Sequence, residues 1–126
     1  MGSRGAFVSV DTGNFSFVSN GQNYFSVGEL STNPNVKILL QARGSVKAPE
    51  FSHTEGRIYA IVQDGRLKHV TFYDDKHLQA VSIDLTIPHY RLLPHKHLYL
   101  DHDTALPISD AEKRLIEQIR KEYNLR

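Results

Sequence analysis

The stretch RIYAIVQDGRLKHVTFY, residues 57–73, decides the fold. It contains two runs rich in β-branched and aromatic residues, 57–63 and 66–73, which are joined by Asp64-Gly65. An Asp-Gly pair tolerates the positive backbone angles of a two-residue turn, so this stretch predicts a tight β-hairpin.

Further strands are predicted on both sides of this hairpin. Residues 78–85 and 96–100 alternate apolar and polar side chains and predict a third and a fourth strand of a meander. Residues 6–27 are rich in Phe, Val, Tyr and Ser and predict two or three short strands. Residues 36–42 are apolar enough for a buried strand or a short helix, and periodicity leaves that choice open.

The C-terminal segment 109–123 predicts a helix. Ser109 followed by Glu112 forms a capping box, which marks the start of a helix. Apolar side chains follow at helical spacing, at Ala111, Leu115, Ile116, Ile119 and Tyr123. We therefore predict an α+β fold in which a mostly antiparallel β-sheet, a meander, is packed on one face by this C-terminal helix.

Length and composition predict a single domain over residues 1–126. Residues 1–5 are expected to form a flexible start, and residues 44–56, with Pro49 and two glycines, a connecting loop. The formal charge of +1 favours neither a nucleic acid nor a membrane surface as a partner. No apolar run approaches a membrane span and no signal pattern begins the chain, so we expect no membrane association and a cytoplasmic location.

Cysteine is absent, whereas histidine is concentrated in one part of the chain. The absence of cysteine excludes thiol nucleophiles and cysteine-ligated metals. The seven histidines all lie between His53 and His102. Any chemistry of this chain is therefore expected from imidazole and carboxylate groups.

Strand alternation predicts which histidines share a face of the sheet. With Asp64-Gly65 as the loop, the simplest register places Ala60 opposite His69. The predicted core face carries Tyr59, Ile61, Val70, Phe72, Val81, Ile83 and Leu85. The predicted opposite face carries Ala60, His69, Thr71, Tyr73, Ser82 and Asp84.

Alternation assigns the side chains of the fourth strand to the two faces in the same way. Leu98 and Leu100 are predicted for the core face. Its other side chains, predicted for the opposite face, are His95, His97, Tyr99 and Asp101. We therefore expect three histidines, His69, His95 and His97, to converge on one exposed face.

The first hypothesis is a metal-independent ribonuclease without a cofactor. Cleavage at a 2′-hydroxyl needs a base, an acid and cations on the phosphate, and histidine serves both proton roles near neutral pH. His95 and His97 are the candidate pair, with His69 beside them. The candidate substrate-binding residues are Arg91 and Lys96 for phosphate, and Tyr73 and Tyr99 for stacking a base or donating a proton.

The second hypothesis is a divalent-metal site. His-x-His on a strand places two imidazoles on one face about 7 Å apart, which suits two ligands of zinc, nickel or iron. The candidates for a third ligand are His69, Asp84 and Asp101. His89 follows Pro88 in a loop that is able to swing over this face, but we expect it to be a spacer. A third hypothesis is a non-catalytic protein that binds a protein partner.

A resemblance covers residues 56–102. It is carried by Ile58-Tyr59-Ala60, by residues 64–69 (DGRLKH), by Phe72-Tyr73-Asp74, by Ile83-Asp84 and by residues 94–97 (PHKH). This segment resembles small uncharacterised proteins and C-terminal modules of Firmicute phages and mobile elements. The resemblance implies an accessory protein of such an element, or a toxin-like effector acting on RNA, and directs attention to His95 and His97. The oligomeric state stays open.

Overall fold

The described residues form one β-sheet and one α-helix. A computed structural model describes residues 8–9, 15–89 and 91–126, so the predicted start at residues 1–5 lies outside the described residues. The elements in these ranges are β1 (Val8–Ser9), β2 (Phe15–Ser19), β3 (Gln22–Leu30), β4 (Asn33–Leu40), β5 (Ile58–Gln63), β6 (Arg66–Tyr73), β7 (Gln79–Asp84), β8 (His95–Leu98) and α1 (Asp110–Tyr123).

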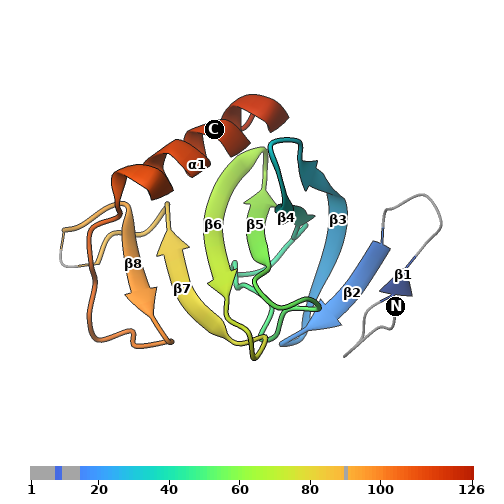
Figure 1. Cartoon of the computed structure of the whole chain (residues 1–126), viewed down its shortest axis with the longest axis horizontal. Helices are drawn as coiled ribbons and strands as arrows, with labels where there is room; N and C mark the ends of the chain where they lie inside the picture. Colours follow the sequence, from blue (N-terminus) through green and yellow to red (C-terminus); the bar gives the residue numbers. More distant parts are fainter. Residues whose placement is uncertain (1–7, 10–14, 90) are drawn as a thin grey trace.

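The sheet follows the order of the chain (Figure 1). Each of the eight strands pairs with its neighbours in sequence, and every described pair is antiparallel except β4 with β5, which is parallel. Of residues 36–42, left open between strand and helix, residues 36–40 belong to strand β4 and the last two follow its end. The predicted α+β fold, a mostly antiparallel sheet with a C-terminal helix, is confirmed.

Two predicted local structures are confirmed by their backbone geometry. Asp64 and Gly65 have φ angles of 56° and 71°, which are the positive values that the hairpin turn requires. At the start of α1, the Ser109 side chain accepts a hydrogen bond from the Glu112 N–H at 3.1 Å, and Glu112 accepts one from the Ser109 N–H at 2.7 Å. The capping box is therefore formed as predicted.

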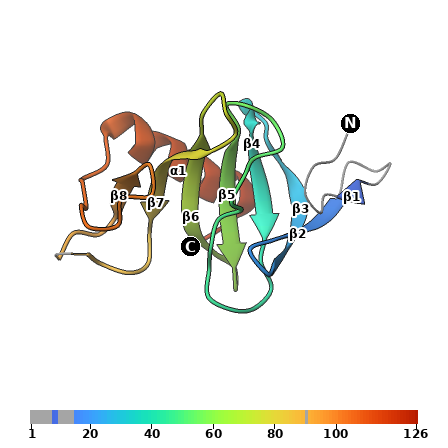
Figure 2. The same cartoon turned by 90° about the horizontal axis from the view of Figure 1, so that it is seen from below.

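Helix α1 lies across one face of the sheet (Figures 1 and 2). Ile116 and Ile119 are buried, and Leu115 and Tyr123 pack partly buried against the same core. Ala111, predicted for this apolar stripe, is exposed, so its inclusion was wrong. In the described part of the chain no helix is both long and apolar enough to cross a membrane.

The predicted register of the β5–β6 hairpin is wrong beyond its turn. Val62 pairs with Leu67, but His69 pairs with Ile61 and not with Ala60, so Lys68 is an extra residue in a β-bulge. Leu67 and Val70 both belong to the core beneath α1, although they are three residues apart. Strict alternation would place them on opposite faces, and the bulge brings both under the helix.

The bulge exchanges the faces predicted for β5. Ala60 packs in the core beneath α1, whereas Tyr59 and Ile61 belong to a second core on the opposite face. The members of this second core are Phe17, Tyr24, Leu39, Ala48, Tyr59, Ile61 and Tyr73. The face predicted to be open and polar is therefore covered by this second core over β5 and part of β6. The polar side chains of this face lie toward β7 and β8.

The packing of α1 predicts a large difference between two neighbouring substitutions. Ile119 is 0% exposed, so Ile119→Ala should lower the free energy of unfolding by about 2–5 kcal/mol, because it leaves a cavity beneath the helix. Gln118→Ala, at an exposed position of the same turn, should change it by less than about 0.5 kcal/mol. Urea unfolding measures both, and equal effects would contradict the packing of α1.

Candidate metal centre

The site is built on two rows of cross-strand neighbours on β6, β7 and β8. In one row, His69 pairs with Asp84, which pairs with His95. In the adjacent row, Thr71 pairs with Ser82, which pairs with His97. Directly paired residues project from the same face of a sheet, so the register places all six side chains on the face opposite α1.

The strand that carries His95 and His97 is shorter than predicted. Strand β8 ends at Leu98, because Tyr99 and Leu100 have φ angles of 49° and 62° and the chain turns there. Tyr99 is 70% exposed, and Leu100, predicted for the core face, is 54% exposed. The predicted alternation through Asp101 is therefore wrong, since the residues after Leu98 belong to a turn.

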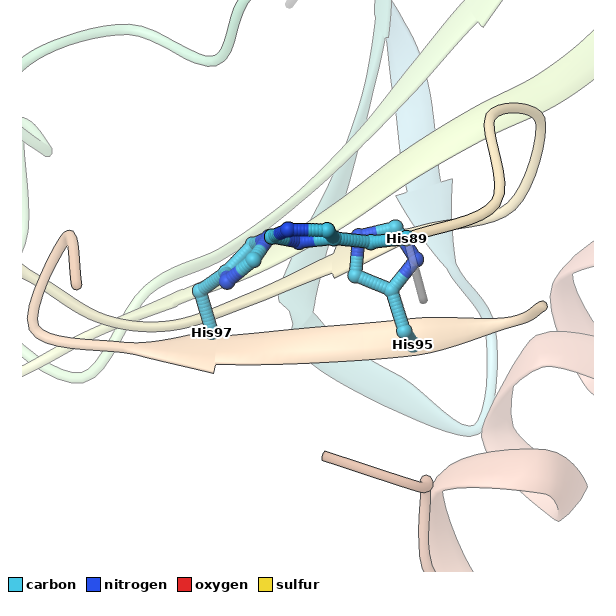
Figure 3. Close-up of side chains that lie close together, drawn as sticks. All are labelled: His89, His95 and His97. Atoms are coloured by element: carbon cyan, nitrogen blue, oxygen red, sulfur yellow. The ribbon is translucent and has the colours of Figure 1, made fainter. Parts of the chain in front are cut away.

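The third histidine of the cluster is His89. His89 and Leu92 exchange two backbone hydrogen bonds, at 3.2 and 2.9 Å, which close a turn in the connection between β7 and β8. One nitrogen each from His89, His95 and His97 lies within 4.8 Å of the other two. The three rings point toward one another (Figure 3). His95 and His97 are 2% and 7% exposed, so the cluster is largely shielded from solvent.

Backbone carbonyl groups fix the protonation of His95 and His97 at Nδ1. His95 Nδ1 lies 3.2 Å from the Leu92 carbonyl oxygen, and His97 Nδ1 lies 2.7 Å from that of Thr104 and 3.0 Å from that of Asp101. A carbonyl oxygen only accepts hydrogen bonds, so each Nδ1 carries the proton and donates it. In the neutral rings the lone pairs are therefore at Nε2.

The two Nε2 atoms face each other at 3.1 Å. Two lone pairs at this distance repel unless a cation lies between them, either a proton or a metal ion. Two nitrogens bound to one tetrahedral zinc ion at about 2.05 Å are about 3.3 Å apart, close to the observed separation. The His95 and His97 pair therefore has nearly the spacing of two zinc ligands, and half-buried His89 offers a third nitrogen within 4.8 Å of both.

Burial disfavours the proton as the bridging cation. Burial lowers the pKa of His95, Asp84 acts in the opposite direction, and the neighbouring His97 and His89 lower it further. Holding a proton between the rings would create a buried imidazolium, which is the form that desolvation penalises. A metal ion offsets the same penalty with coordinate bonds to several nitrogens.

Asp84 is the carboxylate nearest to this cluster in the strand register. Burial alone would raise its pKa, but hydrogen bonds from the Ile87 and Thr86 N–H groups and the nearby His69 outweigh burial and lower it. His69 Nε2 lies 3.6 Å from the Asp84 carboxylate. Burial lowers the pKa of His69, while Asp84 raises it. Asp84 is therefore ionised at neutral pH beside the histidines.

The candidate substrate-binding residues do not gather around the histidines. Tyr73 is buried in the second core, where its hydroxyl donates to the Pro49 carbonyl and burial raises its pKa well above the usual range. Lys96 points to the helix face and pairs with Glu112 at 3.0 Å. Arg91 and Tyr99 are exposed in the turns on either side of β8.

The geometry fits the metal hypothesis better than the acid–base hypothesis. A phosphate cannot enter between two Nε2 atoms that are 3.1 Å apart, and both Nδ1 atoms are engaged by backbone carbonyls. Metal ligation uses the same arrangement directly, because a carbonyl oxygen that accepts from Nδ1 orients the ring and leaves Nε2 free. Among the third ligands predicted from the sequence, His69 and Asp84 lie in the row of His95 but on β6 and β7, outside the cluster of three nitrogens. Asp101 contributes a backbone carbonyl to His97.

Sequence reasoning missed His89 as a member of the cluster. The only sequence signal for His89 was its place in the connection between β7 and β8, which contains Pro88 and Pro94.

Comparison of the chain with protein-family models, with curated proteins and with solved structures found no match. The functional argument is therefore carried by the geometry of the site.

The hydrogen bonds of the two rings predict their tautomers. At neutral pH, in metal-free protein, His95 and His97 should both carry a proton at Nδ1, because carbonyl oxygens accept from that atom. Two-bond nitrogen–proton correlation spectra distinguish Nδ1–H from Nε2–H imidazole. A ring with its only proton at Nε2 would contradict the arrangement.

Proposed function

We propose that this chain binds a divalent transition-metal ion, best matched by zinc, through His89, His95 and His97. The observation that carries the proposal is that the Nε2 atoms of His95 and His97 lie 3.1 Å apart. In both rings the Nδ1 atom is hydrogen-bonded to a backbone carbonyl oxygen. This arrangement supplies two lone pairs at ligand spacing, in a place where burial penalises a proton.

The chemistry of the ligands selects the class of metal. Neutral imidazole nitrogens suit zinc, copper, nickel and iron, whereas calcium and magnesium prefer oxygen ligands. The three ligands come from strand β8 and from the connection that precedes it. A bound ion would tie this connection to the edge of the sheet, so metal binding is expected to stabilise the folded chain.

Zinc binding by the wild-type chain is the first test. Chelator-treated protein should bind one zinc ion per chain by calorimetry. Its stability should rise by about 2.7 kcal/mol when free zinc is about 100 times the dissociation constant. A chain that binds no zinc stoichiometrically would contradict the proposal.

Variants that keep the hydrogen bond but lose the ligand make the test specific. In His97→Asn the amide nitrogen takes the position of Nδ1 and still donates to the carbonyl oxygens, whereas Nε2 is lost. In His95→Asn the amide nitrogen likewise still donates to the Leu92 carbonyl oxygen, and Nε2 is again lost. Each should fold and should weaken zinc binding by at least about tenfold. His53→Asn, outside the cluster, serves as the control. If His97→Asn binds zinc as tightly as the control, the assignment fails.

The same proteins separate the metal hypothesis from the acid–base hypothesis. RNA cleavage that persists in EDTA and disappears in His97→Asn would support a histidine acid–base pair instead. The metal proposal expects no such chelator-resistant cleavage.

Zinc affinity should depend on pH in a defined direction. Each Nε2 must be free of a proton to bind metal, so affinity falls on acidification as protons compete. Because burial lowers the pKa of His95 below the ordinary value of a histidine, its contribution to this loss should begin at a lower pH than that of an exposed histidine. Calorimetric titrations between about pH 5 and pH 8 measure the profile. Affinity that rises on acidification would contradict imidazole ligation.

A further inference from the structure

We propose that His102 is the fourth ligand of the same metal ion, so that the loaded site is a closed set of four imidazoles. This inference rests on the proposed metal binding by His89, His95 and His97 and specifies what occupies the remaining position. Three protein ligands with an open position are typical of catalytic zinc, whereas four protein ligands are typical of zinc that is held and not used for water activation.

Ring distances place His102 next to the cluster of His89, His95 and His97. The His102 ring centroid lies 5.0 Å from that of His97. The corresponding distances are 4.8 Å between His95 and His97 and 5.3 Å between His89 and His97. His102 is thus as near to the central ring as the other members are.

The turn that carries His102 is held against His97 by hydrogen bonds. His97 Nδ1 lies within hydrogen-bond distance of the carbonyl oxygens of Asp101 and Thr104, which flank His102 in sequence. The Asp101 N–H donates to the Leu98 carbonyl at 2.9 Å, which closes the turn onto the end of β8. The contacts that orient the His97 ring therefore also fix the backbone of His102 beside it.

His102 is free to complete the coordination without disturbing the core. Its side chain is exposed, so rotation toward the cluster leaves no cavity in the core. The exposed carboxylates of Asp101 and Asp103 on either side favour the approach of a cation to this turn. His102 would then cover the ion from the solvent side, opposite the buried rings.

Cobalt substitution tests the closed site. Co²⁺ replaces Zn²⁺ in tetrahedral sites, and its visible spectrum changes when an added anion such as azide enters an open coordination position. The full-length wild-type chain loaded with Co²⁺ should keep its spectrum when azide is added. His102→Ala should become sensitive to azide and bind Zn²⁺ at least about tenfold more weakly. His53→Ala, the matched control, should behave as wild type does.

The outcomes separate this inference from the proposed function. If the wild-type chain binds Co²⁺ but responds to azide as strongly as His102→Ala, or if the two bind Zn²⁺ equally well, the fourth ligand is overturned while the three-histidine site stands. If the wild-type chain binds neither ion, the proposed function itself fails. Circular dichroism checks that His102→Ala is folded, as expected for an exposed residue.

Discussion

Burial of one sheet face beneath α1 is the constraint on which the structure depends. The helix covers apolar side chains from β3 to β7 in a single core. Leu67 and Val70 must both enter this core, and they do so only because Lys68 is bulged out of register. A buried apolar side chain of this size contributes about 1.5–3 kcal/mol, which outweighs the local disruption of one ladder position. The bulge therefore decides which residues of β5 and β6 face away from the helix.

The opposite face divides into an aromatic part and a histidine part. Over β5, Tyr59 and Ile61 pair with Thr71 and His69 and lie against the second core. Toward β8, the rows run through Asp84 to His95 and through Ser82 to His97. The six side chains of the two rows on β6, β7 and β8 are all polar. The turns on either side of β8 cover this region and supply its carbonyl groups, so the site forms where the aromatic core ends.

Regular elements could be predicted from the sequence, whereas the composition of the cluster could not. The Asp64-Gly65 turn and the capping box of Ser109 depend on local backbone chemistry, so a single sequence is enough to place them. The i, i+2 spacing of His95 and His97 likewise fixes a shared face on any strand. The bulge at Lys68 follows from competition for the core beneath α1, which alternation alone does not reveal. His89 joins the cluster through a turn closed by backbone hydrogen bonds, and such a turn has no side-chain pattern.

Charge balance is a requirement that the proposed imidazole site would have to meet. Neutral histidines bring no negative charge to a divalent ion, and the groups on their Nδ1 atoms are carbonyls and not carboxylates. The compensating charge must therefore come from a neighbour, and Asp84 lies directly across from His95 in the ladder. Its lowered pKa keeps it ionised, because the backbone N–H groups of Thr86 and Ile87 hold one carboxylate oxygen. The remaining oxygen faces His69, so the negative charge that would offset a cation at the proposed site is fixed in the sheet, one strand away from His95.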